Sequence, residues 1–191
     1  MILIGANDAG PARYLLALSE YLVEPAHWIG SSISKPIFAE RDKNLLYDWT
    51  DTKPSLVLTG TALGPCLDKQ LTQWSHDHGI PCVSIIEHWS WYRKRFELDG
   101  KLVLPDFIIV NDDIARDQAA SDGLPSDRLV VGGNPWLEFL AHENLSAFDK
   151  QAWCEKYRLP SSRLVVFISE ALRQVFPPGS EDYLGYDEFS V

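Results

Sequence analysis

The sequence predicts an α/β fold, a Rossmann-like parallel sheet with helices on both faces. Three apolar runs each pass through a glycine-containing turn and reach a proline: MILIGANDAGP at 1–11, LVLTGTALGP at 56–65 and LVVGGNP at 129–135. Each run is typical of a buried strand that leads into a helix, because proline is favoured at the first helical position. The carboxyl ends of parallel strands share one edge of a sheet, where open α/β folds bind ligands. We therefore expect the three turns to gather beside a ligand.

The rest of the chain continues this alternation. Short apolar runs predict strands at 1–5, 26–30, 54–60, 82–86, 106–110 and 128–131. Helices are expected at 11–22, 65–78, 112–121 and 136–142, and residues 45–49 suggest a further short helix. Leu15, Leu18 and Leu22 fall on one helical face, whereas Gly79 and Gly123 end the helices before them. This order implies a parallel sheet with right-handed crossovers.

The end of the chain differs in character. We expect a Rossmann-like domain over residues 1–145, followed by a linker helix within 147–157. An apolar strand at 163–169 would then begin a second α/β domain, so that residues 146–191 form an incomplete domain of a longer protein. Its last part is acidic and carries three aromatic residues, Tyr183, Tyr186 and Phe189.

Composition restricts the classes of partner. Lys and Arg total 17 against 27 Asp and Glu, which gives a net charge of −10. Nucleic acid and anionic membranes are therefore unfavoured partners, because they require clustered basic charge. Hydrophobic residues make up 46% of the chain, enough for a substantial core, yet no apolar run approaches the roughly 18 residues of a membrane span. We expect a cytoplasmic protein without a transmembrane segment.

No metal site or disulfide is predicted. The three cysteines, Cys66, Cys82 and Cys154, are far apart in sequence and are expected to be small buried side chains. His76 and His78 are two residues apart near a helix end, and side chains at that spacing point apart on a helix.

The first turn contains candidate substrate-binding residues. It lacks the dinucleotide-binding pattern, because Asn7 occupies the place of the second glycine. Gly5 and Gly10 would let a ligand approach the backbone, and Asn7 or Asp8 would cap the helix. Since the Asp8 carboxylate would repel a phosphate, a sugar hydroxyl is the expected ligand. The alternative is an ordinary tight turn with a cap.

The strongest candidates for chemistry follow the strand at 82–86. Glu87 is placed to act as a general base, and His88 to hydrogen-bond a substrate oxygen. Trp89 or Trp91 would stack on a sugar or a base. The alternative is an aromatic loop over the sheet edge in which Glu87 pairs with a nearby arginine, Arg93 or Arg95. The Arg93–Arg95 run is itself either a solvated face or an anion-binding group.

Other turns supply further candidates. Thr61 is expected to cap the helix after the second glycine turn, and Asn134 the helix after the third, where it either closes a tight turn or lines the site. Asn111, Asp112 and Asp113 follow a strand and are expected to cap the next helix. Glu170, at the end of the strand expected at 163–169, would contact a ligand from the second domain.

Three segments of the chain resemble a known family. Residues 80–89 (IPCVSIIEHW), 104–111 (LPDFIIVN) and 123–135 (GLPSDRLVVGGNP) resemble the N-terminal half of two-domain GT-B proteins, especially the UDP-N-acetylglucosamine 2-epimerase-like superfamily. The resemblance covers residues 1–170 in element order, with the motifs confined to 80–135. It implies a nucleotide-sugar, as substrate rather than cofactor, bound between two domains. The C-terminal domain would hold most of the donor nucleotide, and the N-terminal domain the acceptor side.

The resemblance also bears on chemistry. It places Glu87 near the acid/base glutamate of the epimerases. However, this chain has Gly60-Thr61 where the epimerase pattern has glycine followed by aspartate, and residues 96–105 lack a second acidic motif. Transfer of a sugar to an acceptor hydroxyl, in glycan or polysaccharide biosynthesis, is therefore preferred over epimerisation.

Two other functions remain as alternatives. The first is a non-catalytic Rossmann-like binding or assembly module that works with a partner subunit, which would dock on the aromatic tail. The second is a nucleotide-sugar 2-epimerase relative.

Overall fold

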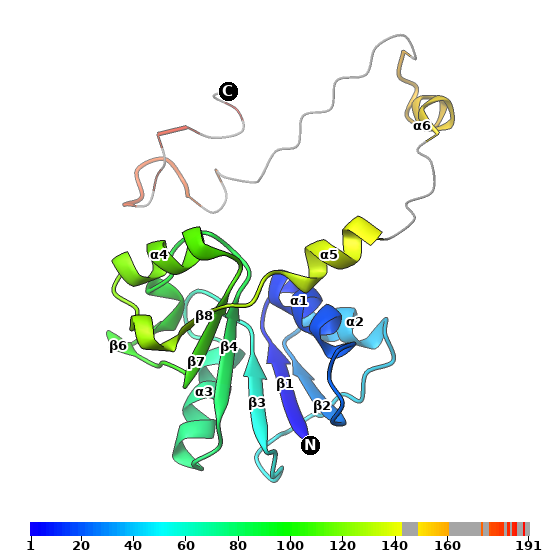
Figure 1. Ribbon diagram of the computed structural model, residues 1–191. Coiled ribbons are helices and arrows are strands. Elements are labelled where there is room, and N and C mark those ends of the chain that lie inside the picture. Colours follow the sequence, from blue (N-terminus) through cyan, green and yellow to red (C-terminus); the bar gives the residue numbers. More distant parts are fainter. Residues whose placement is uncertain are drawn as a thin grey trace. The chain divides into compact units, whose positions relative to one another are not determined.

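The structure, a computed structural model, describes residues 1–142, 149–160, 173, 176–181, 183, 185, 186 and 189. The chain divides into two compact units, Met1–Glu143 and Asn144–Val191. The first unit contains a six-stranded parallel sheet (Figure 1). Its strands are β1 (Ile2–Ala6), β2 (Ala26–Gly30), β3 (Leu56–Thr59), β4 (Cys82–Ile86), β7 (Phe107–Val110) and β8 (Leu129–Val131). The predicted α/β fold with a parallel sheet is confirmed.

The strand order is β2-β1-β3-β4-β7-β8. The chain adds β2 on one side of β1 and then crosses to add β3 on the other side, where Gly5 lies opposite Thr59. The order of the strands therefore reverses between β1 and β3. In open α/β sheets, this switch point is where the loops after two neighbouring strands diverge and leave room for a ligand.

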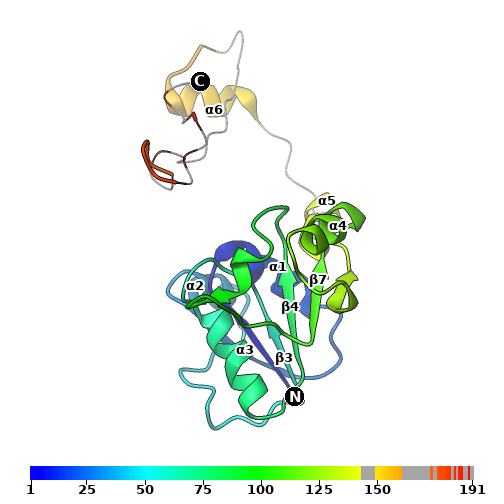
Figure 2. The same ribbon diagram turned by 90° about the vertical axis from the view of Figure 1, so that its left-hand side faces the viewer.

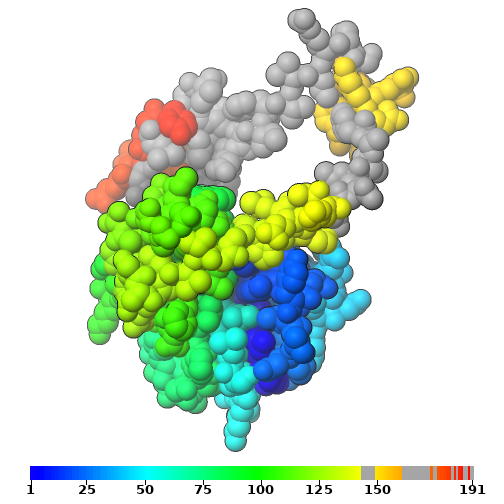
Figure 3. Space-filling model, viewed as in Figure 1, coloured from blue at the N-terminus to red at the C-terminus, as the bar shows by residue number. Residues whose placement is uncertain are grey.

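Helices cover both faces of this sheet, as Figures 1 and 2 show. They are α1 (Ala9–Ser19), α2 (Ser34–Ala39), α3 (Leu67–Asp77), α4 (Asp113–Ser121) and α5 (Pro135–His142). Successive strand residues point to opposite faces. Accordingly, Ile4 packs in a cluster with Leu15 of α1, whereas its neighbour Leu3 packs with Leu71 of α3. The helix α4 packs over Ile108 and Val110 of β7, and α5 packs against α1 (Figure 3).

The short elements between β4 and β7 were not predicted. A 3₁₀ turn at Lys94–Phe96 leads into a two-stranded antiparallel hairpin, β5 (Glu97–Leu98) and β6 (Lys101–Leu102). A second 3₁₀ turn, Ser126–Arg128, precedes β8.

The cysteines Cys66, Cys82 and Cys154 are buried and free, in agreement with the sequence analysis.

Two of the three proline positions were predicted wrongly. The helix α1 begins at Ala9, so Pro11 is its third residue, where a missing N–H also costs no helical hydrogen bond. The helix α3 begins at Leu67, two residues after Pro65. Only Pro135 is the first residue of its helix, α5.

Two further local predictions were wrong. Thr61 does not cap α3, because its hydroxyl donates to the carbonyl oxygen of Ile85 at 3.0 Å while Cys66 occupies the N-cap position. Residues 45–49 are not helical, because the backbone there pairs with β2: the N–H of Leu46 donates to the carbonyl of Trp28 at 2.7 Å. The helix of this region is α2, nearer to β2.

In the second unit, α6 (Lys150–Tyr157) begins at an N-cap, Asp149, whose carboxylate accepts a hydrogen bond from the N–H of Ala152. The strand expected at 163–169 and the candidate Glu170 lie outside the described residues. In the tail, Tyr186 and Phe189 are exposed. Of the helices that the structure describes, none is long and apolar enough to cross a membrane.

Candidate functional site at the carboxyl edge of the sheet

The first turn, Asn7–Gly10, is anchored by hydrogen bonds from two neighbouring segments. The backbone N–H of Asn7 donates to Oδ1 of Asp68 at 2.9 Å, and its carbonyl accepts from the hydroxyl of Ser31. Immediately before the turn, the carbonyl of Ala6 accepts from the Ser34 hydroxyl. The turn is therefore held by the segment after β2 and by the start of α3.

Two glycines permit the close packing beneath this turn. A β-carbon at Gly5 would lie 2.1 Å from a methyl carbon of Leu71, and one at Gly60 would lie 2.4 Å from Cβ of Pro11. Since real side chains do not approach so closely, Gly5 lets α3 pack on β1 and Gly60 lets α1 pack on β3. Gly5 thus lies in the packed interior, whereas Gly10 is at the surface.

Glu87 emerges from the end of β4 and lies against the first turn. Its Oε1 would be 2.9 Å from a β-carbon at Gly10, and its Oε2 is buried without a hydrogen-bond partner among the described residues. Burial raises the pKa of the Glu87 carboxyl, and the charge of Asp8 raises it further, against the lowering effect of Arg95. A half-buried carboxyl group with a raised pKa is suited to hold and release a proton.

The backbone of Glu87 is fixed from the other side by two asparagines. The side-chain amide of Asn111 donates to the carbonyl of Glu87 at 2.9 Å, and that of Asn134 donates to Oδ1 of Asn111 at 3.2 Å. Asn134 also caps α5, since its Oδ1 accepts from the N–H of Leu137, as predicted. The residues that follow β4, β7 and β8 are therefore linked along one edge of the sheet.

Asp68 is a site residue that sequence reasoning missed. It lies in the first turn of α3, is only 2% exposed, and bonds the first turn through Asn7. Burial raises the pKa of Asp68 to about 7, and the charges of Asp8 and Glu87 act in the same direction. An aspartate in the first turn of a helix is ordinary in sequence, so no sequence signal distinguished it.

Two buried cations line the adjoining loop after β3. Nζ of Lys69 donates to the carbonyls of Ala62 and Gly64, both at 2.7 Å. The Arg95 guanidinium donates to the carbonyls of Thr61 and Ser90, both at 3.1 Å. These groups hold the loop in place, and Arg95 rather than Arg93 is the arginine directed toward the sheet.

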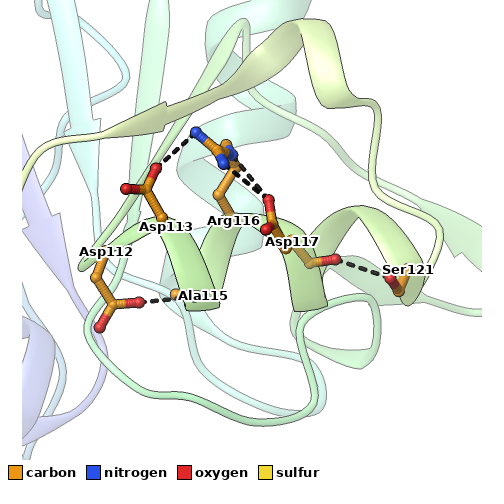
Figure 4. Close-up of polar contacts among 6 residues, drawn as sticks. All are labelled: Asp112, Asp113, Ala115, Arg116, Asp117 and Ser121. Atoms are coloured by element: carbon orange, nitrogen blue, oxygen red, sulfur yellow. Dashed lines mark hydrogen bonds and ion pairs between the residues drawn. The ribbon is translucent and has the colours of Figure 1, made fainter.

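Trp89 and His88 project at the outer side of the same edge. Trp89 is 44% exposed, and its indole N–H donates to Oδ2 of Asp112 at 2.9 Å. The other oxygen of Asp112 caps α4 by accepting from the N–H of Ala115 at 2.7 Å (Figure 4). His88 is exposed and its Nδ1 lies 2.8 Å from the Ser90 hydroxyl.

The structure brings most of the sequence-predicted site residues to one edge, but not all of them. Arg93 is directed toward the end of α4: its side chain pairs with Glu97 at 3.0 Å, and its backbone N–H donates to Asp122. In the part of the chain that the structure describes, no group of three or more acidic, cysteine or histidine side chains is arranged to hold a metal ion. A hollow of about 260 Å³ between α1, α5 and the end of α2 contains none of the predicted site residues.

Several proteins of known structure have a similar fold. No protein-family model and no curated protein matches the sequence. Among solved structures, the UDP-N-acetylglucosamine 2-epimerase of Rickettsia bellii is similar with a TM-score of 0.57 and 13% identity, over 84% of this chain and 52% of that one. The Neisseria meningitidis epimerase, solved with bound UDP-GlcNAc, has a TM-score of 0.53 and 14% identity, over 80% of this chain and 53% of that one.

A third similar structure has a different name. HepE of Anabaena, solved in complex with UDP, has a TM-score of 0.51 and 10% identity, over 70% of this chain and 44% of that one. This chain thus spans about half the length of the structures it resembles. At such low identity the likeness establishes the fold, and the predicted structural resemblance is confirmed at that level. The chain therefore has the GT-B-like α/β fold of one domain of UDP-N-acetylglucosamine 2-epimerases.

Proposed function

We propose that this chain forms the acceptor-side part of an enzyme that transfers a sugar from a nucleotide-sugar to a hydroxyl group. The observation that carries the proposal is the Glu87 carboxyl, which is half-buried at the carboxyl edge and has one oxygen without a hydrogen-bond partner. In the reaction, the Glu87 carboxylate accepts the acceptor's hydroxyl proton. The acceptor oxygen then bonds to the anomeric carbon, and the nucleoside diphosphate leaves with the electron pair of the broken C–O bond.

Neighbouring groups supply the remaining roles. Trp89 offers an exposed ring on which the apolar face of a sugar can stack, and its orientation is held by Asp112. Asp8 is close enough to raise the pKa of Glu87, and His88 follows Glu87 in the chain. Together with Asn7 and Asn134 in the turns at the same edge, they supply polar groups for sugar hydroxyls. The donor nucleotide is held by a second domain, either of the same polypeptide or of a partner subunit. That solved structures of similar fold contain UDP or UDP-GlcNAc supports this class of donor.

The test uses the full-length natural protein with UDP-glucose and UDP-N-acetylglucosamine as donors, and glucose and N-acetylglucosamine as acceptors. Release of UDP is measured for the wild type and for Glu87→Gln. We expect this substitution to lower turnover by about 100-fold or more. Glutamine has nearly the same shape as glutamate, but its amide cannot act as a general base. Donor binding, measured by saturation-transfer NMR, should stay unchanged. The melting temperature should stay the same or rise, because a buried carboxylate is replaced by a neutral group.

The matched control is Glu97→Gln, which neutralises a half-exposed glutamate paired with Arg93. It should leave turnover unchanged, because a surface ion pair contributes little. Wild-type turnover in Glu87→Gln would remove this residue from the mechanism. Failure of the full-length protein to bind either donor would instead favour the non-catalytic binding module.

One observation favours epimerisation as a second candidate. Asp68 and Glu87 both contact the first turn and both have raised pKa values. Inverting a carbon requires one group to remove a proton and another to return one, so two such carboxyls suit the reaction. Incubation of the full-length protein with UDP-N-acetylglucosamine in D₂O, without acceptor, distinguishes the two functions. Epimerisation incorporates deuterium at the inverted carbon, whereas transfer to a hydroxyl leaves all ring C–H bonds intact.

A further inference from the structure

Asp68 connects the two loops that diverge at the switch point of the sheet. It stands at the start of α3, after β3, and it binds the turn that follows β1 through the N–H of Asn7. The opposite end of that turn is Gly10, against which the Glu87 carboxyl lies. The same four-residue turn therefore contacts Asp68 at one end and Glu87 at the other.

We propose that Asp68 is a positioning residue for Glu87: by holding the N–H of Asn7 it sets the turn, and with it Asp8 and Gly10, against the Glu87 carboxyl. The geometric part of this inference stands by itself, whereas its effect on turnover rests on the proposed function.

The hydrogen bond to Asn7 does not by itself require an aspartate at this place. Burying a carboxyl group is costly, and a neutral side-chain oxygen could accept the same hydrogen bond. The adjacent cation does not fully compensate, because the ammonium of Lys69 is hydrogen-bonded to the carbonyls of Ala62 and Gly64. An aspartate offers something that a neutral residue lacks, a charge that depends on protonation.

The groups that face Asp68 make this charge relevant to Glu87. They are Asp8 at the start of α1, Glu87 after β4, Lys69 beside it on α3, and the Cys66 thiol, whose Sγ is 3.9 Å from Oδ2. The nearby charges of Asp8 and Glu87 disfavour ionisation of Asp68, and only Lys69 favours it.

Two substitutions separate the charge from the hydrogen bond. Asp68→Asn keeps an oxygen for the Asn7 N–H but removes the charge, and Asp68→Ala removes both. Asp77→Asn is the control, since Asp77 is an exposed aspartate at the far end of the same helix. The Glu87 titration is followed in the full-length protein by the carboxyl ¹³C chemical shift, and turnover is measured as a function of pH.

We expect Asp68→Asn to leave the Glu87 titration and the turnover close to wild type, because it keeps the hydrogen bond to Asn7 and because Asp8, not Asp68, is the negative charge that raises the Glu87 pKa. In Asp68→Ala the Glu87 titration should be displaced, because freeing the turn changes the position of the Asp8 charge. In Asp68→Ala the freed turn should lower turnover by about tenfold or more, since small displacements of a catalytic group are costly. Asp77→Asn should change none of these.

A Glu87 titration that is unchanged in a folded Asp68→Ala would overturn the proposal, as would wild-type turnover in that variant. If Asp68→Ala does not fold, Asp68→Asn tests the proposal instead: it keeps the hydrogen bond to Asn7, so a turnover well below wild type in it would overturn positioning by that bond. The NMR titration needs no substrate. It also separates the two proposals. If Glu87→Gln keeps full turnover, the proposed function fails, yet a displaced Glu87 titration in Asp68→Ala would still support the positioning by Asp68.

Discussion

The carboxyl end of Glu87 lies directly against Gly10. A β-carbon on residue 10 would lie 2.9 Å from Oε1 and 3.4 Å from Cδ of Glu87, although the two residues are far apart in sequence. Gly10 is the second residue of α1, at the surface. A side chain at this helix position would therefore require the carboxyl end of Glu87 to move.

We predict that Gly10→Ala will separate stability from activity. Alanine is a better helix former than glycine, so the free energy of unfolding should stay the same or rise by up to about 1 kcal/mol. The new methyl group must displace the Glu87 carboxyl, so turnover should fall. Urea unfolding and the UDP-release assay measure the two effects. Gly5→Ala is the contrasting control, which should destabilise the fold through its clash with Leu71. Wild-type turnover in Gly10→Ala would contradict the prediction.

Asp112 has two partners, and we predict that Asp112→Ala will release both. Loss of the cap on α4 should lower the free energy of unfolding by about 1 kcal/mol. Loss of the bond to Trp89 should shift that residue's indole N–H signal in ¹H–¹⁵N NMR spectra and speed its exchange with solvent. Asp113→Asn, at the next position, is the control (Figure 4). It breaks only an exposed ion pair with Arg116 and should leave the Trp89 signal in place. An unmoved signal in Asp112→Ala would refute the coupling.

The stability of the fold should fall as the pH rises through neutrality. The pKa of Asp68 is raised to about 7, whereas an aspartate in an unfolded chain titrates near 4. The contribution of Asp68 to the free energy of unfolding is therefore complete below about pH 4 and is lost as the pH rises from there through about 7. The largest loss that this shift allows is about 4 kcal/mol. The raised pKa of Glu87 acts in the same direction.

Urea unfolding of the wild type and of Asp68→Asn at pH 5 and pH 8 tests this dependence. The variant should gain stability relative to the wild type at pH 8, because it has no buried charge to form. An equal difference between the two proteins at both pH values would show that Asp68 does not titrate in this range.

Local patterns were sufficient to predict the parallel sheet and most of the helices. The six strands are short apolar runs ended by turn residues. Such patterns depend only on residues that are neighbours in the sequence. The turn at Asn134 was also predicted, since its cap lies within its own turn. The errors at Thr61 and at residues 45–49 have another origin. In both places a long-range hydrogen bond, to Ile85 or to Trp28, replaced the local one that the sequence suggested.

The sequence by itself determined that polar residues follow the strands, and therefore that Asn7, Glu87, Asn111 and Asn134 lie at one edge of a sheet. This follows from chain direction in a parallel sheet and needs no tertiary detail. Only the tertiary structure decided which side chains meet there. Asp68 contacts Asn7, Arg95 and not Arg93 contacts Thr61, and Glu87 lies against Gly10. The physical reason is that strand order and helix packing bring these residues together. Neither of the two can be recognised from the residues nearby along the chain.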